Sequence, residues 1–269
     1  MDEVQKRIKF CLNRRSEVLD ISFMNLTQLP SNLPDFIKIL HCNNNQIIEL
    51  PETLPSSLVQ LYCHNNKIKR IPSYSLSNVK WIYCENNNIK EMPSKLPYSL
   101  IGLLCSNNQM EEFSSNLPTT VYYLDISRNL IKKFHLNISP NAPNYLTLIY
   151  CNHNQLVELP SNLPLSLKTL RCDNNYLKHL PSLPIQLQNF TCSDNDKYMY
   201  ISKRNAERFR LIETPNYSKK AIIIQHTWKV YQCKQIMIRM INNNDNVLFH
   251  CFKYYGDLNI INLIIQFIY

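Results

Sequence analysis

The chain has 269 residues, a mass of 31.8 kDa, 45% hydrophobic residues and a formal net charge of +9 at pH 7. Its two glycines are too few for glycine-rich phosphate loops, and the motifs GxSxG, HExxH, GxxxxGKS/T and GxGxxG are missing, which excludes those hydrolase, zinc-protease and nucleotide-binding signatures. The positive charge is uneven, because residues 1–196 carry 18 Lys and Arg against 16 Asp and Glu, whereas residues 197–269 carry 11 against 4.

Residues 1–16 are predicted to form a helix that caps the N-terminal end of the fold. Acidic residues stand at the start of the segment and basic residues at its end, as favours a helix. The apolar residues share one helical face: Val4, Ile8, Cys11 and Leu12. The segment has no apolar stretch typical of a signal peptide, so we expect an intracellular protein.

Residues 17–196 repeat one short pattern about nine times. The copy from Leu54 to Pro72 reads LPSSLVQLYCHNNKIKRIP. Successive copies are 21 residues apart, except for steps of 25 and 20 residues near the end. The apolar anchor of the copies recurs at Leu19, Leu40, Leu61, Ile82, Leu103, Leu124, Ile149, Leu170 and Phe190. A fixed short period with constant apolar offsets predicts a stacked solenoid.

Each copy predicts a short strand with a buried face and an exposed face. Leu61 and Cys63 point to one side, and Tyr62 and His64 point to the other. Two copies have Ile at the Cys position, so we interpret it as a small apolar core position. The chain has no CxxC and no Cys/His cluster at zinc spacing, so we expect no metal, no disulfide and no cofactor. Cysteine fills this position at Cys42, Cys63, Cys84, Cys105, Cys151, Cys172 and Cys192.

An asparagine recurs three residues after the Cys position. Its amide can bond backbone groups of its own turn and of the next coil, groups that would otherwise be buried unpaired at a cost of about 1–3 kcal/mol each. We therefore interpret the column as structural and not as a ligand site. Its members are Asn45, Asn66, Asn87, Asn108, Asn129, Asn154, Asn175 and Asn195.

The second half of most copies carries Leu-Pro twice, as in Leu50-Pro51 and Leu54-Pro55. Two prolines within five residues disfavour a helix and favour extended or polyproline-type backbone. We expect an outer wall that is nearly free of helices. The four extra residues of the long copy fall in residues 137–144, where we expect a surface bulge.

The full pattern, LxxLxCxxNxIxxLPxxLP, resembles a leucine-rich repeat, specifically the short double-LP subclass of bacterial effector proteins. The Cys-containing strands and the abundance of Asn, Ile, Lys and Tyr also resemble leucine-rich-repeat proteins of giant DNA viruses. The resemblance covers about 180 of the 269 residues. It implies a leucine-rich-repeat solenoid with short parallel strands on the concave face, an extended convex face and helical caps at both ends. A viral origin would place the protein in a host cytoplasm or a virion.

The concave face is where such scaffolds usually bind a protein partner, whose identity the sequence does not reveal. Exposed aromatic side chains on a rigid surface can anchor a partner. The alternative is that aromatic residues are present because they suit strands. The candidate partner-binding residues are Tyr62, Trp81, Tyr83, Leu104, Tyr123, Leu148 and Tyr150.

The repeat ends after Asn195, and we divide the remainder into a transition at residues 197–218 and a basic helical cap at residues 219–269. The pattern AxxIQxxxKxxxxK begins at Ala221 and resembles an IQ motif, although Val230 stands where that family usually has Gly. The resemblance implies a calmodulin-like partner, and the alternative is a helix that packs on the last repeat. The residues concerned are Ile224, Gln225, Trp228, Lys229 and Lys234.

Three further classes of function are considered and not favoured. The double-LP subclass includes ubiquitin-pathway effectors with a catalytic Cys in a large C-terminal domain, but residues 197–269 are too few and lack its Cys-x-Asp motif. Nucleic-acid binding would depend only on the basic tail, whose charges are interspersed with isoleucine. The apolar run from Leu258 covers about 12 residues, too short to span a membrane.

Overall fold

The computed structural model describes residues 2–72, 76–136, 145–196 and 199, together with Asn205, Arg208 and Phe209. The chain divides into two compact units, residues 1–199 and 200–269, and the first contains the repeats. The predicted bulge at residues 137–144 and the predicted helical cap at residues 219–269 lie outside the described residues.

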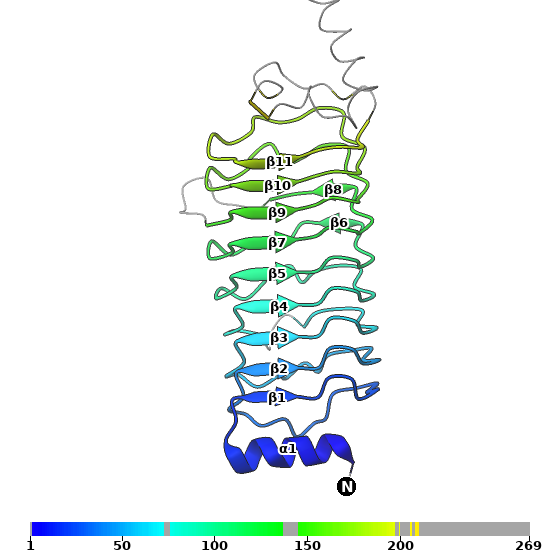
Figure 1. The fold of residues 1–269 in the computed structure, drawn as a ribbon, viewed down its shortest axis with the longest axis vertical. Coiled ribbons are helices and arrows are strands. Elements are labelled where there is room, and N and C mark those ends of the chain that lie inside the picture. The colour runs from blue at the N-terminus through cyan, green and yellow to red at the C-terminus, as the bar shows by residue number, and fades with distance from the viewer. Residues whose placement is uncertain are drawn as a thin grey trace, which may run out of the picture. The chain divides into compact units, whose positions relative to one another are not determined.

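The first unit is a stack of coils, each of which contributes one three-residue strand to a parallel sheet (Figure 1). Anchor residues pair directly from strand to strand, as in Leu19 with Leu40 and Leu40 with Leu61. This confirms the predicted solenoid of short parallel strands. In order across the sheet the strands are β1 (Val18–Asp20), β2 (Ile39–His41), β3 (Gln60–Tyr62), β4 (Trp81–Tyr83), β5 (Gly102–Leu104), β7 (Tyr123–Asp125), β9 (Leu148–Tyr150), β10 (Thr169–Arg171) and β11 (Asn189–Thr191).

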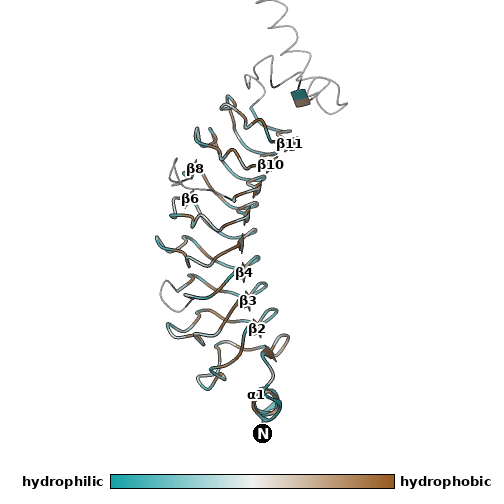
Figure 2. Ribbon diagram, turned by 90° about the vertical axis from the view of Figure 1, so that its left-hand side faces the viewer, coloured by the Kyte–Doolittle hydropathy of each residue, from teal (hydrophilic) through white to brown (hydrophobic). Residues whose placement is uncertain are grey.

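The opposite wall of the coils is built from turns and extended backbone, as the paired Leu-Pro sequences predict. Two short strands pair there in parallel, β6 (Glu112–Phe113) and β8 (Lys133–Phe134). Figure 2 shows them on the side of the stack away from the nine-stranded sheet. In the described parts of residues 17–196 the outer wall contains no helix.

The core lies between these two walls and runs the length of the stack. Along most strands the burial alternates, so that Leu61 and Cys63 are inaccessible while Tyr62 between them is half-buried. In β5 and β10 the first residue, Gly102 or Thr169, is buried as well. Each fully buried Leu or Ile side chain contributes roughly 1.5–3 kcal/mol. In the outer wall Phe113 and Phe134 meet edge-on, with ring centroids 5.9 Å apart.

The cysteine column is buried, in keeping with the interpretation of a small apolar core position. The eight cysteines in the described residues form no disulfide with one another. Several donate a hydrogen bond to a strand carbonyl of the next coil, as from Cys42 Sγ to the Tyr62 oxygen at 3.3 Å and from Cys105 Sγ to the Asp125 oxygen at 3.2 Å. The thiols therefore pack as apolar groups and also cross-link neighbouring coils weakly.

Helix α1 (Glu3–Arg14) covers the first coil, so the predicted N-terminal helical cap is present. Val4, Ile8 and Cys11 are buried against the stack, whereas Leu12 remains 47% exposed. The expectation that Leu12 belongs to the apolar face was wrong, because it lies one residue further around the helix than Cys11, beyond the edge of the buried stripe.

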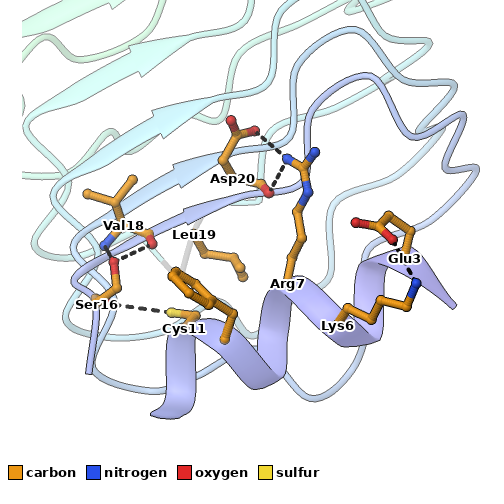
Figure 3. A pocket seen from close by; sticks show the side chains of 9 residues that line it. Glu3, Lys6, Arg7, Cys11, Ser16, Val18, Leu19 and Asp20 are labelled. Atoms are coloured by element: carbon orange, nitrogen blue, oxygen red, sulfur yellow. Dashed lines mark hydrogen bonds and ion pairs between the residues drawn. The ribbon is translucent and has the colours of Figure 1, made fainter. Parts of the chain in front are cut away.

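The cap also satisfies the open edge of the sheet at β1. The Arg7 guanidinium donates to the Asp20 carbonyl at 2.9 Å, and the Ser16 hydroxyl donates to the Val18 carbonyl at 2.8 Å (Figure 3). An unprotected edge strand would offer its backbone groups to another chain. The pocket between α1 and β1 in Figure 3 is thus lined by groups that close the end of the stack.

Candidate functional site

The exposed side of the nine-stranded sheet, here called the strand face, consists of three columns of side chains. Two columns flank the anchors and contain all seven predicted partner-binding residues. The third follows the Cys position, as the period of two that places His64 on the exposed side predicts, but none of its members was a predicted partner-binding residue. It comprises Ser22, Asn43, His64, Glu85, Ser106, Ser127, Asn152, Asp173 and Ser193.

The structure brings the seven predicted residues onto one continuous surface over β3, β4, β5, β7 and β9. Tyr62, Tyr83 and Leu104 are direct neighbours across three strands, and Tyr123 pairs with Leu148. Each of the seven side chains is half-buried. We call this surface the aromatic segment: Tyr62, Trp81, Tyr83, Leu104, Tyr123, Leu148 and Tyr150.

The rings at the N-terminal side of the aromatic segment are stacked. Tyr62 and Tyr83 lie almost parallel with centroids 4.3 Å apart, and Trp81 lies 6.0 Å from Tyr83. His41 extends the stack at 4.4 Å from Tyr62. Sequence reasoning did not include His41, although it shares the column of Tyr62. Stacking holds the rings in fixed orientations before any partner binds.

Trp81 is positioned by a glycine in the neighbouring strand. A Cβ placed on Gly102 would lie 2.2 Å from Trp81 Cε3, so the indole fills the space that a side chain would occupy. Gly102 therefore serves close packing, with the indole lying over its backbone.

Gly102→Ala is expected to displace the Trp81 indole and expose it to solvent, because the added methyl overlaps the six-membered ring. Acrylamide quenching of Trp81, measured in a Trp228→Phe background, should increase. Thr169→Ala serves as the control, because Thr169 lies in the same column of the sheet as Gly102 but does not neighbour Trp81. Unchanged quenching in the Gly102 variant would show that the indole does not rest on this glycine.

The C-terminal side of the aromatic segment has a different arrangement. Tyr123 and Tyr150 meet edge-on at 5.3 Å, and the Arg171 guanidinium lies over the Tyr150 ring at 4.8 Å. The face of a tyrosine ring attracts a cation at such a distance. The strand face thus already contains one guanidinium bound to a tyrosine.

Two half-buried carboxylates border the aromatic segment, Glu85 after β4 and Asp125 in β7. Asp125 Oδ1 accepts hydrogen bonds from the Ser127 backbone at 2.9 Å and hydroxyl at 2.6 Å. Glu85 Oε2 is buried and has no hydrogen-bond partner among the described residues. Burial raises the pKa of Glu85 to about 7, and the negative charge of Asp125 adds to the effect. Burial also raises the pKa of Asp125.

The asparagine column bonds the backbone at the end of each strand. Asn108 Oδ1 accepts from the Ile89 N–H at 3.0 Å, and its Nδ2 donates to the Cys84 and Cys105 carbonyls at 3.0 and 3.1 Å. Ile89 and Cys84 belong to the preceding coil, so the prediction of bonds to the next coil was wrong. The same pattern recurs at Asn45, Asn66, Asn87, Asn129, Asn154, Asn175 and Asn195.

The direction of these bonds follows from the parallel strands. The Cys84 N–H donates to the Leu104 carbonyl of the following coil at 2.9 Å. The Cys84 carbonyl points the same way, because the N–H and C=O of one residue in extended backbone lie on the same edge. The asparagine of the following coil therefore meets it.

Among the described residues, no three His, Cys, Asp or Glu side chains are grouped as metal ligands would be. No helix in the described part of the chain is both long and apolar enough to traverse a bilayer. The predicted calmodulin-type residues fall outside the described residues: Ile224, Gln225, Trp228, Lys229 and Lys234.

No protein-family model and no curated protein matches the chain. Among solved structures it is similar to YopM from Yersinia enterocolitica WA-314, at 29% identity and a TM-score of 0.50 over 71% of this chain and 50% of that one. It is also similar to the functional domain of InlJ from Listeria monocytogenes, described as including a cysteine ladder, at 23% identity and a TM-score of 0.59, over 69% of this chain and 40% of that one.

These matches span half or less of the solved chains, and the InlJ likeness concerns the fold alone. Both solved proteins are leucine-rich-repeat proteins, so the leucine-rich-repeat solenoid predicted for this chain is confirmed.

Proposed function

We propose that this chain is a non-enzymatic scaffold that binds a protein partner through the aromatic segment of its strand face. The observation that carries the proposal is the stacked row His41, Tyr62 and Tyr83, with Trp81 beside it, on one exposed surface. Large aromatic side chains dominate the energetics of protein interfaces. The general likeness to YopM, a leucine-rich-repeat protein, agrees with a binding role.

The aromatic segment favours binding because its rings are ordered in advance. Trp81 is fixed by Gly102 and Tyr83 is fixed by Tyr62. A partner that packs on these rings does not have to immobilise them, and ordering an interface side chain costs roughly 0.5–1.5 kcal/mol. The short coils present the rings on a sheet whose strands hydrogen-bond to both neighbours, so the spacing of the contacts is also fixed.

The test is a double substitution, Trp81→Ala with Tyr83→Ala, in the full chain. A partner captured by crosslinking from cell extract should bind this variant more than about 2 kcal/mol more weakly, roughly 30-fold in Kd. The control is Tyr98→Ala with Tyr176→Ala, which removes two tyrosines that are 86% and 61% exposed away from the strand face. Circular dichroism establishes that each variant is folded.

Equal affinity of both double variants would remove the strand face from the proposal. Calmodulin-type binding is the alternative, motivated by the AxxIQxxxKxxxxK pattern. It requires a calcium-dependent partner that Ile224→Asp with Trp228→Ala abolishes and that the strand-face variant retains.

A further inference from the structure

We propose, building on the proposed function, that the strand face recognises a basic segment of its partner, with a lysine or arginine side chain bound beside Glu85 and Asp125 and against the rings of Tyr83 and Tyr123. This recognition follows from the arrangement of charge on the three strands β4, β5 and β7.

Glu85, Asp125, Tyr83 and Tyr123 lie in or just after the strands to either side of β5, in the middle of the aromatic segment. Tyr83, Leu104 and Asp125 are direct neighbours across β4, β5 and β7. Glu85 lies two residues beyond Tyr83 and Tyr123 two residues before Asp125, so all four share the exposed side of the sheet. Between Trp81 and Tyr123 the neighbouring column contains only the glycine of β5. The Trp81 indole lies over that glycine, so Leu104 is the side chain that stands between Tyr83 and Asp125.

The strand face is acidic although the chain as a whole is basic. Its three columns contain four carboxylates and one guanidinium, whereas the full chain has a net charge of +9. Asp20 is bonded by Ser22 and lies 3.7 Å from Arg7, and Asp173 accepts from Ser193. The acidic groups at the two ends of the face therefore have partners within the chain. In the middle, Asp125 has the same bonds from Ser127, so the group that lacks a hydrogen bond there is Glu85, through its buried Oε2.

Of these carboxylates, Glu85 gives the strongest evidence for a cationic partner. Its Oε2 is buried and receives no hydrogen bond from the described residues, and a buried carboxylate without a partner is costly. Asp125 uses Oδ1 for both of its bonds to Ser127. A lysine or arginine of a partner would supply charge-assisted hydrogen bonds to these carboxylates, and such bonds are about twice as strong as neutral ones.

The aromatic rings suit the same ligand. Tyrosine faces attract cations, and arginine does so more often than lysine. The chain itself shows this pairing two coils away, where Arg171 lies over Tyr150 at 4.8 Å. Carboxylates with tyrosine faces would discriminate against an acidic or phosphorylated segment by repulsion. A nucleic-acid partner is disfavoured on the same ground.

The test uses a displayed library of random peptides selected on the full-length protein, with the Trp81→Ala, Tyr83→Ala variant used to identify strand-face binders. We expect these binders to be enriched in lysine and arginine. Glu85→Gln with Asp125→Asn should bind them about tenfold more weakly. Asp20→Asn, the same change in the column of Asp125 at the far end of the sheet, should stay within about twofold of the parent.

A double-mutant cycle identifies the contact. It combines the protein variant with a peptide whose lysine is acetylated or whose arginine is replaced by citrulline. The modification should weaken binding to the parent about tenfold and should have little further effect on the Glu85→Gln, Asp125→Asn variant. Measured above pH 7, where Glu85 is ionised, Glu85→Gln alone preserves shape and removes only the charge. It therefore tests the site even if the second substitution disturbs the turn at Ser127.

The outcomes separate the two proposals. Binders that need Trp81 and Tyr83 but are neutral or acidic, or that ignore the Glu85 and Asp125 substitutions, would overturn the basic-segment inference and leave the proposed function standing. A library in which no binder depends on Trp81 and Tyr83 would overturn both.

Discussion

Replacing Asn108 with alanine is expected to lower the free energy of unfolding by about 3–5 kcal/mol. The buried amide accepts the Ile89 N–H at 3.0 Å and donates to the Cys84 and Cys105 carbonyls at 3.0 and 3.1 Å. Alanine leaves all three backbone groups without these bonds. Each buried unsatisfied group costs roughly 1–3 kcal/mol, and relaxation of the turn recovers part of the sum.

The adjacent asparagine provides the control for this experiment. Asn107 is exposed, has a φ of 54° and donates one side-chain bond, to Asn86 at 2.6 Å. Asn107→Gly keeps the left-handed backbone at little cost, so it should lose less than about 1 kcal/mol. Urea unfolding followed by circular dichroism measures both variants. Equal losses at the two positions would show that the asparagine column does not stabilise the turns as described.

Alkaline pH is expected to destabilise the fold steeply, beginning near pH 9. Burial raises the pKa of six thiols of the cysteine column above the ordinary value of 9.0, in the case of Cys42 to about 12: Cys42, Cys63, Cys84, Cys105, Cys151 and Cys172. Above pH 9 the unfolded chain releases these protons while the folded chain keeps them. The folded state then binds more protons, so stability falls by about 1.4 kcal/mol per pH unit for each thiol until its folded pKa is reached.

Urea unfolding between pH 8 and pH 10.5 measures this slope, and one substitution assigns it. Cys84→Val removes one ionising thiol and should reduce the slope by about 1.4 kcal/mol per pH unit. An aliphatic side chain fits the position, because Ile126 occupies it in another coil with no exposed surface. Tyrosine and lysine ionisation affects both proteins equally. An unchanged slope in the Cys84→Val variant would contradict the role of the buried thiols.

The repeating elements of this fold could be predicted from the sequence because each coil contacts mainly its neighbours. The anchors Leu40 and Leu61 are 21 residues apart and pair directly in the sheet. The 21-residue period of the sequence therefore gives the register between neighbouring strands, and no pairing of distant segments has to be predicted separately. The alternation of Leu61, Tyr62 and Cys63 placed the buried and exposed sides for the same reason.

The details of the site could not be predicted in the same way, because they depend on side-chain positions across strands. Nothing in the sequence shows that the Trp81 ring rests on Gly102, or that one oxygen of Glu85 is buried without a hydrogen bond. The period of two predicts that Glu85 shares the face of Tyr83. Its environment, however, also depends on Asp125, which lies forty residues away and two strands across the sheet.

The most direct test of binding through the strand face is site-specific photocrosslinking in cell extract. A photoreactive phenylalanine analogue is placed at Leu104, in the centre of the aromatic segment, and separately at Leu165, which is 77% exposed outside the three strand-face columns. Binding through the strand face predicts a protein adduct from position 104 that disappears when Trp81 and Tyr83 are alanine. An adduct from position 165 with none from position 104 would contradict it.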